Sequence, residues 1–305
     1  MIFSSNDSSY SWFGSSNYSS SRHSAADEGN CPHLKQNETR VQYLLPILYT
    51  IFLWWFSTGV IIYLDGLPQR SLRWSYVALT LLCVASLYGL AVTRDDTSVG
   101  GAYMAFTHGL IVWGWQIASF FMGYITGPRR TACSAGCAGV RHFWHGVQTC
   151  LYHELAIISG AVLVVLATWG GANQIGTYTF LILWGMHQVS KLNVFFGVRN
   201  LYEEFLPDQV RYLAAFFSRR PMNMFFPFSV TLATAGMVFL FQQAFAPNVS
   251  EFNATGYTFL CFLTALGVLE LWLLVLPLPL RLWDWGLRSR RNHTADADVP
   301  GIVRT

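Results

Sequence analysis

The sequence predicts an all-α fold, a polytopic membrane helical bundle with about seven transmembrane helices. Of its 305 residues, 53% are hydrophobic and only 11% are charged, whereas an ordinary soluble domain is about 25% charged. Apolar runs recur near the length of about 20 residues that a helix needs to cross a bilayer. No strand-like alternation competes with them, and helices satisfy their own backbone hydrogen bonds within lipid.

Seven apolar runs divide the chain into segments. They cover residues 43–64, 74–92, 100–124, 150–169, 174–197, 225–246 and 256–277. The Ser-rich tail 1–42 is expected to be disordered, and it lacks the apolar core of a cleavable signal peptide. A membrane domain then spans residues 43–288, and a polar tail covers 289–305. Only residues 170–173 join the fourth and fifth runs, which predicts a tight antiparallel hairpin.

The distribution of basic residues predicts the orientation. Arginines concentrate in the loops that follow runs one, three, five and seven, whereas the opposite loops between runs hold only Arg94. By the positive-inside rule, the C-terminus is then cytoplasmic and the N-terminus lies on the opposite side. An odd number of membrane helices follows from this arrangement.

The loop between runs five and six is predicted to contain a short amphipathic helix. Pro207 and Asp208 are a good helix start, and Val210, Leu213 and Phe217 share one face of the helix that follows. We expect this helix to lie on the cytoplasmic surface of the membrane. An ordinary surface helix that packs on neighbouring loops fits the same pattern.

Polar residues inside the runs suggest a site. At a rise of 1.5 Å per residue, Lys191 lies roughly 10 Å inside the cytoplasmic end of its run. A similar estimate places His108 alone in the outer half. The other polar residues fall in the cytoplasmic half: Gln116, His153, Glu154, His187, Lys191 and Glu270. Such residues normally face the bundle interior and pair with one another.

We therefore predict a polar pocket that opens toward the cytoplasm. In this hypothesis Glu270 or Glu154 is the counter-ion of Lys191, and His153 and His187 are available to a ligand. The alternative is that the ion pair only locks helices together and that both histidines bond to neighbouring side chains, because intramembrane polar pairs often hold helices to each other.

Two further patterns each have a functional and a structural explanation. Cys133, Cys137, His142 and His145 offer four zinc ligands. The spacing between the two pairs is far shorter than the dozen or so residues of a zinc finger, so no metal site is predicted there. Trp113 and Trp115 fall in mid-membrane and suit a flat apolar ligand such as a tetrapyrrole or carotenoid. Core or lipid-facing packing explains such tryptophans more often.

Several long stretches resemble one known family, the PuhE family of photosynthetic complex assembly proteins from purple phototrophic bacteria. The resemblance covers residues 44–290 and is carried by Leu53-Trp-Trp-Phe-Ser-Thr-Gly59, Arg94-Asp-Asp-Thr-Ser-Val99, Gly123-Tyr-Ile-Thr-Gly-Pro-Arg-Arg130, His153-Glu-Leu-Ala156, Thr168-Trp-Gly-Gly171, Asn173-Gln174, Lys191-Leu-Asn193, Asn200-Leu201, Glu203-Glu-Phe-Leu-Pro207, Arg219-Arg-Pro-Met-Asn223 and Leu276-Pro-Leu-Pro279.

The resemblance implies a role in forming the reaction centre and light-harvesting core, or in supplying bacteriochlorophyll to it. It implies the bacterial inner, intracytoplasmic membrane, with a periplasmic N-terminus, and photosynthetic subunits or other assembly factors as partners. It implies no nucleic acid and no established reaction. Bacteriochlorophyll is made on the cytoplasmic side, and a neutral imidazole is the usual ligand of its magnesium, so His153 and His187 are the residues expected to hold it.

Two other function classes remain open. The first is a membrane enzyme acting on a tetrapyrrole or isoprenoid, with His153, Glu154 and Lys191 as acid–base groups. The second is a small-molecule transporter, which the central charged pair favours. Against it, the two halves of the chain show no internal repeat and no pair of broken helices.

Overall fold

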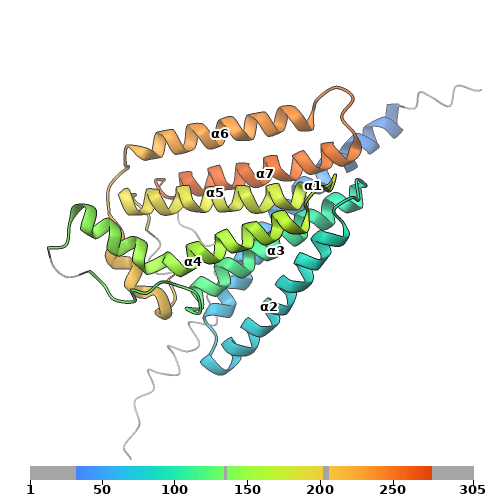
Figure 1. Cartoon of the computed structure of the whole chain (residues 1–305). Coiled ribbons are helices and arrows are strands. Elements are labelled where there is room, and N and C mark those ends of the chain that lie inside the picture. Colours follow the sequence, from blue (N-terminus) through green and yellow to red (C-terminus); the bar gives the residue numbers. More distant parts are fainter. Residues whose placement is uncertain (1–31, 134–135, 202–205, 277–305) are drawn as a thin grey trace, which may run out of the picture. The chain divides into compact units, whose positions relative to one another are not determined.

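The computed structural model describes residues 32–133, 136–201 and 206–276 (Figure 1). These residues form α1 (Pro32–Asp65), α2 (Gln69–Val92), α3 (Val99–Phe121), α4 (Gly139–Ala167), α5 (Ile175–Phe196), the 3-10 helix η2 (Asp208–Phe216), α6 (Phe225–Ala244) and α7 (Glu251–Leu273). Their only β pairing is an isolated bridge between Val198 and Arg219. The all-α prediction is thus confirmed for the described residues.

Five of the described helices are long and apolar enough to cross a membrane: α1 from Gln42, α2 from Arg70, α4, α6 and α7. This supports the prediction of a membrane protein with transmembrane helices. Helices α3 and α5 do not meet the same criteria, and they carry polar side chains such as Gln116, His187 and Lys191. That all seven α-helices span the bilayer, and which side each end faces, stay predictions.

Two helices begin well before the apolar runs that predicted them. Helix α4 begins at Gly139, eleven residues ahead of the run 150–169, so His142 and His145 are helical. Helix α1 begins at Pro32, inside the predicted tail 1–42. Residues 1–31 and the predicted tail 289–305 lie outside the described residues. The chain divides after Glu38 into two units, and everything below concerns residues 39–305.

Helix α3 contributes much of the core. It packs against α2, α4, α5 and α7, and its Phe106 ring stacks on Phe259 of α7 at a centroid distance of 4.4 Å. Helices α3 and α5 approach closely at Gly109 and Gly176, where a Cβ added to Gly109 would lie 2.5 Å from the Gly176 carbonyl oxygen. Small residues of this kind let membrane helices pack backbone to backbone.

Buried Asn173 joins the loop before α5 to the loop between α2 and α3. Its Nδ2 donates to the carbonyl oxygens of Asp96 at 2.9 Å and Gly101 at 3.0 Å, and its backbone N–H donates to the Arg94 carbonyl at 2.7 Å. Its Oδ1 accepts from the Ile175 N–H, one of the free donors at the start of α5. One side chain therefore fixes the predicted α4–α5 hairpin against α2 and α3.

A second asparagine fixes the other end of α5. Asn223 Nδ2 donates to the carbonyl oxygens of Asn193 at 3.1 Å and Gly197 at 2.9 Å. Its Oδ1 accepts from the N–H groups of Phe225 and Phe226 and so caps α6. The two asparagines hold both ends of the helix that carries His187 and Lys191.

The segment in which an amphipathic helix was predicted forms the 3-10 helix η2. It starts at Asp208 as expected and buries Val210 and Phe216. It ends before Phe217, so the expected apolar face is one residue shorter. That this segment is amphipathic and lies on the cytoplasmic membrane surface stays a prediction.

Candidate functional site

A partly open cleft of about 760 Å³ lies among α1, α3, α4, α5, α7 and η2. Its walls are mainly apolar and aromatic, with Trp113, Phe120, Phe143, Phe195 and Phe216 among them. The volume falls within the range of about 300–1,000 Å³ that is typical of ligand pockets. Because four of the six predicted site residues line it, this cleft is the candidate site.

An ion pair stands in the wall of the cleft. The Lys191 ammonium on α5 binds Oε1 of Glu154 on α4, and the Gln188 amide donates to Oε2 of the same carboxylate. The side chains of Lys191 and Glu154 are 29% and 24% exposed. Of the two counter-ions that the sequence allowed for Lys191, the structure places Glu154 in that position.

Glu270 also lines the cleft, but it has a different partner. Its Oε1 accepts a hydrogen bond of 2.7 Å from the indole Nε1 of Trp54 on α1. Glu270 therefore links α7 to α1 across the cleft and takes no part in the Lys191 pair.

Two histidines meet beside the cleft. The rings of His153 and His187 are 5.8 Å apart and nearly perpendicular, and His187 also lies edge-on to Trp113 at 5.4 Å. His187 lines the cleft, whereas His153 is fully buried behind Phe120. Within the described residues, Nε2 of His187 and both ring nitrogens of His153 have no hydrogen-bond partner. Buried polar groups normally have one, so these unpaired nitrogens call for an explanation.

Gln116 lies near this group without lining the cleft. Its Nε2 donates to the carbonyl oxygen of Ala156 on α4 at 3.2 Å and lies against Gly160. This contact joins α3 to α4 about one helical turn after His153. His108, which was expected in the outer half, packs against Gly89 of α2 and is no part of the cleft.

Among the polar residues of the cleft that sequence reasoning missed are Trp54, Asp65 and Gln188. Gln188 precedes Lys191 by three residues and so shares its helix face, which was a usable signal. Asp65 directly follows the first apolar run, where an acidic residue is easily taken as a simple boundary. The role of Trp54 depends on the neighbouring α7, which the sequence of α1 does not reveal.

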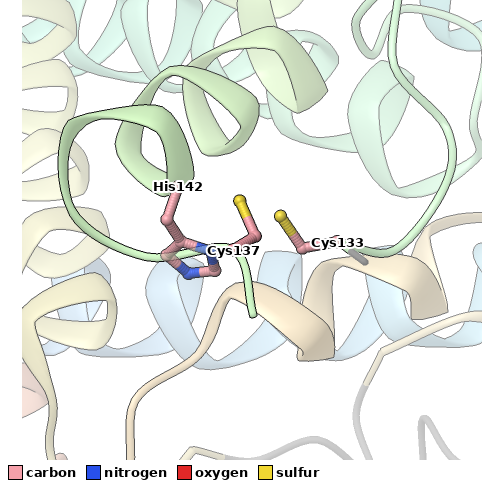
Figure 2. Close-up of side chains that lie close together, drawn as sticks. All are labelled: Cys133, Cys137 and His142. Carbon is pink, nitrogen blue, oxygen red and sulfur yellow. The ribbon is translucent and has the colours of Figure 1, made fainter. Parts of the chain in front are cut away.

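A second group of reactive side chains forms outside the cleft lining. Atoms of Cys133, Cys137 and His142 that are able to bind metal all lie within 4.8 Å of one another (Figure 2). Nδ1 of His145 lies 3.2 Å from the Cys133 sulfur and 3.3 Å from the Cys137 sulfur. The neighbouring Cys133 thiol raises the pKa of Cys137. The short spacing that argued against a metal site is therefore no obstacle, because the chain turns and brings all four residues together.

Comparisons with known proteins give a family without an assigned activity. Residues 40–294 match a family described as a protein of unknown function, DUF3623. A relative from Rhodobacter capsulatus is 36% identical over 266 residues, which cover 85% of this chain and 97% of the relative. It is described as an uncharacterized 30.4 kDa protein in the puhA 5' region. No solved structure matches the chain.

Proposed function

This chain belongs to the DUF3623 family, and from that premise we propose that it is a membrane factor that assists assembly of the photosynthetic reaction centre and light-harvesting core. The position of the relative beside puhA supports this proposal. So does the resemblance of residues 44–290 to the PuhE family, whose genes accompany photosynthesis genes. The apolar helices agree with a photosynthetic membrane as its location.

We further propose that the cleft receives bacteriochlorophyll or a related tetrapyrrole. The observation that carries this proposal is the His187 ring in the cleft wall, whose Nε2 has no hydrogen-bond partner among the described residues. This Nε2 is buried, so a turn of the ring would be needed to present it to the cleft, where a neutral imidazole nitrogen would be able to hold the magnesium of such a pigment. The His153 ring lies 5.8 Å from that of His187, and both of its nitrogens also lack a hydrogen-bond partner in the part of the chain that the structure describes.

The rest of the cleft fits a large flat ligand. Aromatic side chains such as Trp113, Phe120 and Phe195 offer apolar surface to the faces of a macrocycle. The paired charges of Glu154 and Lys191 provide one polar edge in a mainly apolar wall. A few polar groups in an apolar pocket fix the orientation of a ligand.

The absorption spectrum of the protein purified in mild detergent from a pigment-producing host tests the proposal. Wild type should carry tetrapyrrole absorbance, and His187→Ala should lose most of it. His108→Ala is the matched control, because this histidine also lies within the helices but away from the cleft. A colourless wild-type protein from a pigmented host contradicts pigment binding and leaves assembly through protein contacts. Equal pigment in all three proteins contradicts the role of His187.

One observation favours an enzyme as the second candidate. Glu154, Lys191 and Gln188 form a hydrogen-bonded group at the cleft surface, as acid–base chemistry on a bound tetrapyrrole or isoprenoid requires. Deletion of the gene separates the two functions. Loss of an assembly factor leaves the chemistry of pigment precursors unchanged, whereas loss of an enzyme makes an altered precursor accumulate.

A further inference from the structure

The loop before α4 and the first turns of α4 bring two thiols and two imidazoles together. Cys133 and Cys137 come from the loop, and His142 comes from α4 (Figure 2). His145 lies three residues after His142 in α4 and so shares its helix face. Gly136 and Gly139 have φ angles of 85° and 63°. These left-handed conformations favour glycine and let the chain turn back within a few residues.

The separations suit a tetrahedral zinc ion. Bond lengths of about 2.3 Å to sulfur and 2.0–2.1 Å to nitrogen place the ligand atoms of such a site roughly 3.3–3.8 Å apart. The distances of 3.2 and 3.3 Å from His145 Nδ1 to the two sulfurs lie close to that range. A ligand nitrogen of His142 lies within 4.8 Å of both sulfurs, so zinc binding would require its ring to approach the ion.

The side chain of His142 packs against two other elements. The ring of His142 stacks between Phe195 of α5 and Phe216 of η2, at centroid distances of 5.7 and 5.3 Å. Its Nδ1 is buried and has no hydrogen-bond partner within the described residues. The loop is bound to α4 because the Arg129 N–H donates to the Gln148 carbonyl at 3.3 Å. Within the loop, the Arg129 guanidinium donates to the Ala132 carbonyl at 3.0 Å.

We propose that Cys133, Cys137, His142 and His145 form a closed zinc site. Two thiolates and two imidazoles in a tetrahedral set favour zinc over harder cations such as magnesium or calcium. Four protein ligands leave no open position for a substrate, which defines a structural site and not a catalytic one. Deprotonated cysteines bind the ion directly, and their two charges balance it.

The position of the site indicates what the zinc ion stabilises. Phe143 follows His142 in α4 and lines the cleft together with Phe195 and Phe216, the two rings that hold His142. Bound zinc therefore fixes the loop, the start of α4 and one aromatic wall of the cleft as a unit. This role does not depend on which ligand the cleft binds.

Metal analysis of the purified full-length protein tests the proposal. Wild type from zinc-supplemented cells should contain about one zinc ion per chain. Cys137→Ser and His145→Ala should lose it, whereas the control Cys83→Ala, at a buried cysteine of α2 far from the cluster in sequence, should keep it. The proposal is overturned if the wild type contains no metal, whether Cys133 and Cys137 are then free thiols or form a disulfide.

Cobalt substitution tests the ligands in the wild-type protein, so its result does not depend on whether the variants fold. Wild type reconstituted with Co²⁺ should show a thiolate-to-cobalt charge-transfer band and the intense visible bands of tetrahedral cobalt. Chelation should remove these bands and lower the Tm of the wild type, and re-addition of zinc should restore the Tm. A spectrum of octahedral cobalt without thiolate bands contradicts the assigned ligands.

Discussion

Lys191 on α5 and Glu154 on α4 form an ion pair in the wall of the candidate cleft. The pair joins two helices that a short loop already connects, and Gln188 completes the hydrogen bonds of the carboxylate. A charge inside a membrane bundle is costly when it stands alone. The pairing therefore explains how both charges are tolerated at this position.

Removal of one charge of the pair should destabilise the protein more than removal of both. Glu154→Gln leaves the Lys191 ammonium uncompensated, with an expected loss of about 1–3 kcal/mol, since the site is partly exposed. The double variant Glu154→Gln with Lys191→Met should recover part of this loss. Thermal unfolding in detergent measures both effects.

The exposed pair Arg94–Asp95 provides the control for that experiment. Asp95→Asn should change stability by less than about 1 kcal/mol, because its side chain is 67% exposed. If Glu154→Gln lowers stability no more than Asp95→Asn does, the partly buried Lys191–Glu154 pair stabilises the protein no more than the exposed pair does.

Glu270 should respond differently from Glu154. Glu270→Gln keeps an oxygen acceptor for the Trp54 indole, so we expect a change in stability of at most about 0.5 kcal/mol. Glu270→Ala removes the acceptor and should cost about 1–2 kcal/mol. Chemical unfolding of both variants measures the difference. A large loss in Glu270→Gln would show that the negative charge itself is needed.

Asn173→Asp should be among the most damaging isosteric changes in the chain. It replaces an amide that donates to the Asp96 and Gly101 carbonyls with a carboxylate oxygen that repels them. Because the side chain is buried, we expect a loss of about 3 kcal/mol or more. Asn253→Asp, at an exposed position of α7, should change stability by less than about 0.5 kcal/mol. Thermal melts of the two variants, run side by side, decide this.

Two glycines of α5 should separate close packing from helix propensity. A Cβ at Gly176 would lie 2.3 Å from Leu90 and 2.8 Å from the Ala105 carbonyl, whereas a Cβ at Gly185 meets nothing within 4 Å. Gly176→Ala should therefore lose about 1–3 kcal/mol through overpacking. Gly185→Ala should be neutral or gain up to about 1 kcal/mol, because alanine favours the helix. Equal unfolding midpoints for the two variants would contradict the close α3–α5 contact.

Much of the candidate site was predictable because membrane depth follows from residue count. Counting 1.5 Å per residue placed His153, Glu154, His187 and Lys191 at similar levels, and the structure brings them together. The same count placed Glu270 and Gln116 at that level. It did not predict that Glu270 bonds to Trp54 or that Gln116 turns to the α4 backbone.

The sequence by itself determined that the chain is helical and that its long apolar runs contain only a few polar residues. These features follow from composition and run length, which are local properties. Only the tertiary structure decided the choice of Glu154 over Glu270 as partner of Lys191. It also gathered Cys133, Cys137 and His142 despite their unusual spacing. The physical reason is rotation: successive helix residues point about 100° apart, and which neighbour each side chain meets depends on how the helices pack.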